Sequence, residues 1–237
     1  MDNAGILPKE QGWYPEKIHA DLDAVILGMH VREDNPELLK ALDMGLSIFS
    51  YPEWIFEQTR NKKRIVIGGS HGKTSITAMV LHVLHHNSID TDYMVGAQLA
   101  GFDTMVRLTD NAPYVVLEGD EYLSSPIDRR PKFHLYRPHV ALISGISWDH
   151  INVFPTFDNY VEQFSIFIDM IEEGGELIYC ANDPVVKQIS EKSRVSKSPY
   201  SIPEHKTTDG VTHLQTKEGE VPLKVFGNHN LMNLEGA

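Results

Sequence analysis

The sequence is short of the features that mark secreted and membrane proteins. It contains one cysteine, Cys180, among 237 residues, so no disulfide can form within the chain and a reducing compartment is expected. We predict that Cys180 is a small buried apolar residue at the end of a strand rather than a catalytic group. The amino terminus has no basic segment followed by an apolar one, and no apolar run is as long as a membrane span. We therefore expect a cytoplasmic protein with no membrane partner.

Positive charge is also scarce. The chain has 21 lysines and arginines against 33 aspartates and glutamates, which gives a formal net charge of −12. Nonspecific binding to nucleic acid depends on a basic surface, so we expect no nucleic-acid partner. An anionic nucleotide can still bind, because one lysine, a helix amino terminus and Mg²⁺ together create a local positive site.

What the sequence does contain is a repeated alternation of short apolar strands and amphipathic helices. This pattern is typical of an α/β fold with a mostly parallel sheet and flanking helices. The segment 193–217 is polar and rich in turns, and we expect weak strands there at most. We predict strands at 23–28, 47–49, 64–68, 92–95, 114–117, 140–144 and 176–179, and helices at 35–44, 51–58, 73–84 and 157–171.

The polar, charged segment 61–64 predicts a domain boundary. The first domain, 1–60, supplies about two strands and two helices, which is too few for a complete nucleotide-binding half, so we expect a truncated Rossmann-like domain. The second domain spans 61–237. Both ends of the chain suggest a piece of a longer protein.

The most informative stretch joins the apolar strand 64–68 to the next helix. It reads Gly69-Ser70-His71-Gly72-Lys73-Thr74-Ser75, which is the layout of a phosphate-binding loop. Glycines allow backbone N–H groups to turn toward phosphate oxygens, and the helix amino terminus adds partial positive charge. Lys73 is placed to reach terminal phosphates, and the Thr74 hydroxyl to ligate Mg²⁺. Ile67 stands where the standard pattern has its first glycine, so the loop is shorter than usual.

A second motif follows the predicted strand at 114–117. Glu118, Asp120 and Glu121 lie at its carboxyl end, where open α/β sheets bind ligands. Glu118 is the first candidate for a Mg²⁺ ligand, with the other two as outer or alternative ligands. The competing interpretation is a solvated acidic turn. A phosphate loop on another strand of the same sheet favours the metal site.

A third motif, Asp149-His150, follows the predicted strand at 140–144. The pair can hold a second cation, or His150 can contact a transferring phosphoryl group. A structural histidine is the alternative.

The fourth motif reads Gly227-Asn228-His229-Asn230-Leu231-Met232-Asn233. Asparagine amides can pair with the donor and acceptor edge of adenine. A Gly-Asn turn without any ligand is the alternative.

Together the four motifs resemble the Mur ligase family, the ATP-dependent amide ligases of peptidoglycan precursor synthesis. That family has a shortened loop matched by 69–74, a strand-end glutamate matched by Glu118, an Asp-His pair matched by Asp149-His150, and a motif matched by 227–233. Their order and spacing agree over nearly the whole chain. The resemblance implies a phosphate-loop central domain and a family architecture of three domains, of which the carboxyl-terminal one is expected to be absent here.

Within the family, His71 and the acid run 118–121 are similar to the UDP-N-acetylmuramate branch. That branch contains an L-alanine ligase and a murein-tripeptide ligase. The segments 28–36, 120–122 and 128–133 look closer to the tripeptide ligase. Leu123 departs from the pattern, because the family usually has a further aspartate there.

The resemblance also implies roles for individual residues. Lys73, Glu118 and His150 would be catalytic. Thr74 and Glu118 would hold the ATP-bound Mg²⁺, and His150 a second Mg²⁺. The residues implied to bind ATP are Gly69, Ser70, His71, Gly72, Lys73, Thr74, Ser75, His229, Asn230 and Asn233.

The implied reaction begins when the carboxylate of UDP-N-acetylmuramate attacks the γ-phosphate of ATP to form an acyl phosphate. The amine of L-alanine or of murein tripeptide then displaces phosphate. We expect this chain by itself to bind MgATP weakly and to form no amide. Two other functions stay open: an acid–amino-acid ligase of the folylpolyglutamate type, and a noncatalytic ATP-binding module.

Overall fold

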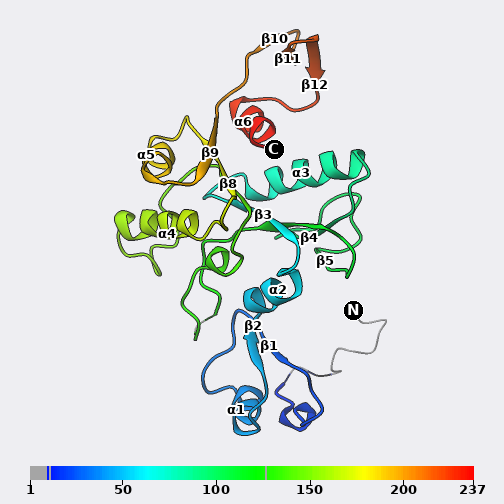
Figure 1. The fold of residues 1–237 in the computed structure, drawn as a ribbon, viewed down its shortest axis with the longest axis vertical. Coiled ribbons are helices and arrows are strands. Elements are labelled where there is room, and N and C mark those ends of the chain that lie inside the picture. Colours follow the sequence, from blue (N-terminus) through cyan, green and yellow to red (C-terminus); the bar gives the residue numbers. More distant parts are fainter. Residues whose placement is uncertain (1–9, 11, 126) are drawn as a thin grey trace.

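The computed structural model describes residues 10, 12–125 and 127–237. In this part of the chain the strands form three sheets, with two, seven and three strands. Figure 1 shows the seven-stranded sheet in the middle, with the two-stranded sheet and the three-stranded sheet at opposite ends of the long axis. Among the helices that are described, none combines the length and apolarity that crossing a membrane requires.

The seven-stranded sheet confirms the predicted α/β class with a mostly parallel sheet. Its strand order is β5-β4-β6-β3-β7-β8-β9. The pairing of β4 with β5 is antiparallel, and the other neighbouring pairs are parallel. The strands are β3 (Lys63–Gly68), β4 (Thr91–Met94), β5 (Val106–Arg107), β6 (Tyr114–Glu118), β7 (Val140–Ile143), β8 (Glu176–Cys180) and β9 (Ser196–Tyr200). Cys180 is buried at the end of β8, as predicted.

The strand before the predicted phosphate loop, β3, lies between β6 and β7. Ile67 on β3 pairs with Glu118 on β6, and Gly68 pairs with Ile143 on β7. Because the three strands are parallel and in register, their carboxyl ends open onto one edge of the sheet. We call this edge the loop edge. The segments that carry the first three sequence motifs therefore leave the sheet side by side.

Helices cover both faces of the sheet (Figure 1). On one face lie α3 (Lys73–His86) and α6 (Asn228–Gly236), and on the other lie α2 (Tyr51–Thr59), α4 (Phe157–Asp169) and α5 (Pro184–Lys192). Successive residues of a strand point to opposite faces. Accordingly, Val66 packs in the α4 core and Ile67 in the α3 core.

The helix α4 confirms the prediction that the aromatic stripe of 157–171 belongs to the core. Tyr160, Phe164 and Phe167 recur at helical spacing and are fully buried. Phe133 stacks on Phe167 with ring centroids 4.5 Å apart and meets Phe164 edge to face at 5.3 Å. The Thr156 side chain caps the helix by accepting a hydrogen bond from the backbone N–H of Asn159.

In the predicted first domain, 1–60, the described residues form the two strands and two helices expected from the sequence. The short 3-10 helix η2 (Pro15–Lys17) precedes β1 (Val25–Leu27), α1 (Pro36–Asp43), β2 (Ile48–Ser50) and α2. The strands β1 and β2 pair in parallel. Asn35 caps α1, and α2 begins with a capping box in which Ser50 and Glu53 bond each other's backbone N–H. The boundary after residue 60 stays a prediction.

Two cations of the polar, charged segment 61–64 are buried. Lys62 and Arg64 are 8% and 3% exposed. The Lys62 ammonium lies 2.7 Å from an oxygen of Asp92, and the Arg64 guanidinium donates to backbone carbonyls and to Glu172 at 3.2 Å. Buried cations are tolerated when they are paired and hydrogen-bonded. The segment thus leads into β3, which begins at Lys63, and is anchored by its buried charges.

The carboxyl-terminal third holds more regular structure than predicted. The strand β9 joins the central sheet at its edge, where Pro199 is tolerated because no further strand needs its N–H. The strands β10 (His205–Thr208), β11 (Val211–Thr216) and β12 (Gly219–Leu223) form the antiparallel three-stranded sheet. The fourth motif is not a simple turn, because most of it lies in the helix α6.

Candidate functional site

Two glycines shape the turn after β3. Gly69 and Gly72 have φ angles of +128° and +81°, which side chains disfavour. A Cβ on Gly69 would overlap the Ser144 hydroxyl, and a Cβ on Gly72 would lie 2.5 Å from the Asn233 side-chain oxygen. The helix α3 begins directly after Gly72, so the backbone N–H groups of its first turn face the loop edge. This geometry is that of an anion-binding loop.

Lys73 is held at the mouth of this turn. Its ammonium donates to the Gly69 carbonyl at 2.7 Å and lies 2.8 Å from a carboxylate oxygen of Glu121. The Lys73 side chain is 16% exposed and Glu121 is 1% exposed. A positive charge therefore stands beside the loop, with one face open to solvent.

The second and first motifs meet where β6 ends. The Thr74 hydroxyl donates to one oxygen of the Glu118 carboxylate at 2.8 Å, and the other oxygen accepts from the backbone N–H of Gly96 at 2.9 Å. Hydroxyl and carboxylate oxygens are the ligands that Mg²⁺ prefers. The two residues predicted to hold the nucleotide-bound cation are thus adjacent, although 44 positions separate them in the chain.

The third motif lies beside the acid run. Ligand atoms of Asp120, Glu121 and His150 fall within 4.8 Å of one another. His150 Nε2 is 3.8 Å from Glu121 and 3.8 Å from Asp149. Carboxylates and an imidazole at this spacing form a candidate cation site. Its membership differs from the predicted pair, because Asp120 and Glu121, considered from sequence as outer or alternative ligands, accompany His150 in place of Asp149.

His150 has an unusual backbone. Its φ angle is +54°, in the left-handed region that costs a non-glycine residue about 1 kcal/mol. The backbone N–H of His150 donates to the Asp149 carboxylate at 2.6 Å, and the ring lies 4.7 Å from that of Tyr122. These contacts keep the strained backbone in place and aim the imidazole at the acid run.

Two further residues reach the site, and no motif identified them. Lys132, in the short helix η3 (Lys132–Leu135), is buried and forms an ion pair with Asp120. Burial tends to raise the pKa of Asp120, but the Lys132 hydrogen bond and charge outweigh it and lower that pKa. Tyr160 of α4 bonds both Ser70 and Glu121. The sequence pattern of α4 indicated only a core position for it.

The fourth motif contributes one residue to the loop directly. Asn233 is 3% exposed and lies against Gly72. Its side-chain nitrogen has no hydrogen-bond partner within the described residues. Asn230 donates to the backbone carbonyl of Phe226 at 3.0 Å, and His229 is exposed. His71 and Ser75, at the other end of the predicted ATP-binding set, are exposed as well.

A cavity of about 380 Å³ opens beside the loop edge. Its walls include Lys73, Glu118, Asp120 and Lys132, together with Tyr51 from the first turn of α2. Residues of the first two motifs and of the first segment thus share one hollow, which is large enough for part of an anionic ligand.

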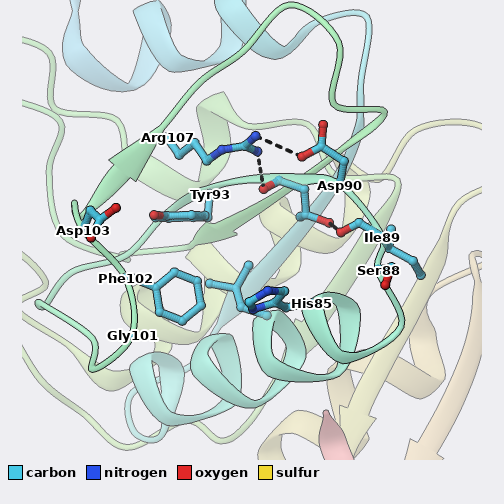
Figure 2. A pocket seen from close by; sticks show the side chains of 11 residues that line it. His85, Ser88, Ile89, Asp90, Tyr93, Gly101, Phe102, Asp103 and Arg107 are labelled. Carbon is cyan, nitrogen blue, oxygen red and sulfur yellow. Dashed lines mark hydrogen bonds and ion pairs between the residues drawn. The ribbon is translucent and has the colours of Figure 1, made fainter.

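A different cavity, of about 550 Å³, lies between the carboxyl end of α3 and the strands β4 and β5 (Figure 2). Arg107 projects into it and pairs with Asp90 at 3.0 Å and with Asp92 at 3.2 Å. Tyr93 and Phe102 meet edge to face at 5.1 Å. The cation here is already neutralised, and none of the four motifs reaches this cavity.

Comparison with known proteins adds a family match. Residues 67–237 match the model of the Mur ligase middle domain. The chain is 30% identical over 222 residues to the UDP-N-acetylmuramate–L-alanyl-γ-D-glutamyl-meso-2,6-diaminoheptandioate ligase of Haemophilus influenzae. The alignment covers 89% of this chain and 49% of the relative. It is 28% identical over 240 residues to the UDP-N-acetylmuramate–L-alanine ligase of Desulforamulus reducens. That alignment covers 95% of this chain and 50% of the relative.

The fold is shared with solved structures. The UDP-N-acetylmuramate:L-alanyl-γ-D-glutamyl-meso-diaminopimelate ligase from Neisseria meningitides superposes with a TM-score of 0.79 at 22% identity, over 90% of this chain and 72% of that one. The chain spans about half the length of the curated relatives it matches.

Proposed function

Because this chain belongs to the Mur ligase family, we propose that it carries the ATP-binding centre of an amide ligase. The reaction activates a carboxylate as an acyl phosphate and then transfers the acyl group to an amine. The attacking carboxylate and the γ-phosphate are both anions, so neutralising their charge is the main task of the site.

In this proposal the phosphate loop and Lys73 receive the nucleotide. The backbone N–H groups at the start of α3 bind phosphate oxygens, and the Lys73 ammonium neutralises the β- and γ-phosphates. The position of Lys73, 2.7 Å from the Gly69 carbonyl, supports this role. Asn233 is proposed to help bind the adenosine part, since it is buried against Gly72 and has an unpartnered side-chain nitrogen within the described residues. His229 and Asn230 stay predicted partners of the same part.

The donor set at the loop edge fits Mg²⁺. Thr74 and Glu118 would hold the ion that accompanies ATP, because both offer oxygen atoms and already lie 2.8 Å apart. His150 would hold a second ion, with Glu121 and Asp120 as neighbouring donors. When bound, such ions supply positive charge that stabilises the developing charge on the phosphoryl group.

For the substrates we propose UDP-N-acetylmuramate as the acid and either L-alanine or murein tripeptide as the amine. The names of the two curated relatives support this choice, since one is an L-alanine ligase and the other acts with a tripeptide. Residues 1–60 are proposed to belong to the sugar-nucleotide domain and 61–237 to the ATP-binding domain. We also propose that the protein acts in the cytoplasm.

The observation that carries the proposal is the common edge of three adjacent strands. β6, β3 and β7 bring Glu118, Lys73 with Thr74, and His150 to one place. A noncatalytic ATP-binding module requires the loop and Lys73, but binding alone does not require a histidine held in a strained backbone beside the acid run. A ligase of the folylpolyglutamate type is the second alternative, and a dependence of phosphate release on UDP-N-acetylmuramate would exclude it.

Two variants separate a ligase from a passive binder. We expect Lys73→Ala to weaken ATP binding to this chain at least roughly tenfold, because a charge-assisted contact to the phosphates is lost. His150→Ala should leave ATP binding within about twofold, yet abolish UDP-N-acetylmuramate-dependent phosphate release in the complete ligase. Lys63→Ala, an exposed lysine on β3, is the matched control. Full phosphate release by the His150 variant would contradict the ligase proposal.

A further inference from the structure

Tyr160 occupies a position that neither the core nor the motifs explain by themselves. Its ring is fully buried and packs against Phe154 and Phe164, with centroid distances of 5.4 Å and 5.3 Å. Its hydroxyl, however, is turned away from this apolar cluster. It lies 2.8 Å from the Ser70 hydroxyl and 3.0 Å from an oxygen of Glu121. A phenylalanine would fill the same core position, so the hydroxyl needs its own account.

The hydrogen-bond direction through this hydroxyl is determined by its neighbours. Glu121, paired with the Lys73 ammonium, is a carboxylate and can only accept, so Tyr160 donates to it. The Tyr160 oxygen is then free to accept from the Ser70 hydroxyl. Ser70 in turn accepts from the backbone N–H of Ser147 at 2.9 Å. The chain of donors therefore runs from Ser147 through Ser70 and Tyr160 to Glu121.

This chain of donors ties together four separate segments. Ser147 precedes the Asp149-His150 pair, Ser70 belongs to the phosphate loop, and Glu121 belongs to the acid run. Glu121 has two oxygens: one accepts from Tyr160, and the other holds Lys73 at 2.8 Å. Because Glu121 is almost completely buried, solvent cannot replace a lost donor without rearrangement.

We propose that Tyr160 is a positioning residue, whose hydroxyl fixes Glu121 and Ser70 and thereby holds the phosphate loop and the Lys73 ammonium ready for a nucleotide. The inference rests on the nucleotide-binding role proposed for the loop. Tyr160 touches no reacting atom in this scheme. It acts through Glu121 on Lys73 and through Ser70 on the loop backbone.

The first test measures the loop without any nucleotide. Tyr160→Phe keeps the buried ring and removes the hydroxyl, and Tyr179→Phe is the matched control, because Tyr179 is a buried residue of the same core with no side-chain hydrogen bond recorded in the described part of the chain. Hydrogen–deuterium exchange should be roughly tenfold faster for the amides of 69–74 in Tyr160→Phe. It should be unchanged in Tyr179→Phe. Equal exchange of the loop in both variants would overturn the inference.

The second test is a double-mutant cycle on ATP binding. Because Tyr160 acts in part through Lys73, Tyr160→Phe should weaken ATP binding roughly tenfold, and Tyr160→Phe combined with Lys73→Ala should lose less affinity than the two single losses added together. Fully additive losses, or a loss with Lys73→Ala and none with Tyr160→Phe, would contradict the inference. A wild-type chain that binds no ATP would instead contradict the proposed function, and the exchange measurement would still decide the role of Tyr160.

Discussion

Three lysines around the central sheet each face a carboxylate, and their exposure separates them by task. Lys62 and Lys132 are 8% and 6% exposed and pair with Asp92 and Asp120. Lys73, paired with Glu121, is 16% exposed and stands at the loop edge. For Lys62 and Lys132, the ion pair with a carboxylate is enough to explain why the buried lysine is present. Lys73 alone of the three borders both the anion-binding loop and solvent.

The Lys132–Asp120 pair predicts a specific loss of stability. Lys132→Met should lower the free energy of unfolding by about 2 kcal/mol, because it leaves the carboxylate of Asp120 without its cation. About a third of the Asp120 side chain is exposed, which keeps the loss below that of a fully buried pair. Urea unfolding at neutral pH measures it. Adding Asp120→Asn to Lys132→Met should recover part of the loss. A double variant that is less stable than Lys132→Met would contradict the pairing.

At the residue scale, the sequence could indicate which side chains lie close together where a motif and a strand end coincide, while their roles stay predictions. The adjacency of Thr74 and Glu118 follows from a phosphate loop and a strand-end acid on the same sheet. Tyr160 and Lys132 could not be predicted, because their roles depend on contacts made by α4 and by η3 after folding. A tyrosine in an apolar helical stripe indicates core packing, and nothing in the sequence reveals where its hydroxyl points.

At the scale of elements, α6 completes the phosphate loop by packing Asn233 onto Gly72. Gly72→Ala should lower the free energy of unfolding by about 2–3 kcal/mol, since it adds an overlap with Asn233 to the strain at φ +81°. Gly174→Ala is the matched control, with φ +76° and no atom within 4 Å of the added Cβ. It should cost only about 1 kcal/mol. Equal losses in thermal or urea unfolding would show that α6 does not press on the loop.

The helix α2 is linked to the segment before η3 through Glu53, which bonds the Ser50 backbone N–H and pairs with Arg130 at 2.6 Å. Burial tends to raise the pKa of Glu53, but these two partners outweigh it and lower that pKa below 4.5. A lowered folded-state pKa stabilises the fold above the unfolded value and is lost as pH falls through the folded value.

Glu53→Gln tests this linkage, because glutamine can keep the capping box but loses the charge. At neutral pH the variant should be less stable by about 0.5 kcal/mol, a small effect since a third of the side chain is exposed. The difference from wild type should shrink as the pH falls below 4.5. Glu57→Gln on the same helix is the control. A difference that stays constant or grows toward acid pH would contradict the assignment.

Elements with strong apolar patterns were predicted well, and polar ones were not. The helix α5 was missed although Asp183 caps it and Pro184 opens it, a signal that was present in the sequence. β9 is a polar edge strand containing Pro199, and most side chains of β10–β12 are exposed or only partly buried. Such strands depend on backbone pairing, which leaves little trace in hydrophobic periodicity.

At the scale of the whole molecule, the order β6-β3-β7 is what brings three of the four dispersed motifs into one site. Parallel strands in register bring Glu118, the phosphate loop and the Asp149-His150 pair to the loop edge, and α6 covers the loop from the α3 face. Sequence reasoning could predict that the motifs share an edge from the rule for parallel sheets. It could not predict the strand order, which depends on long-range pairing. That the isolated chain forms no amide stays a prediction.

The central claim, that the loop edge binds MgATP, is tested most directly by calorimetric titration of this chain with ATP in the presence and absence of Mg²⁺. We predict tighter binding with Mg²⁺, and we predict that Glu118→Gln removes most of that gain. Glu176→Gln, at the opposite end of the parallel strand β8, should bind as wild type does. Binding by the wild-type chain that is indifferent to Mg²⁺, or a Glu118→Gln variant that keeps the full gain, would contradict the account.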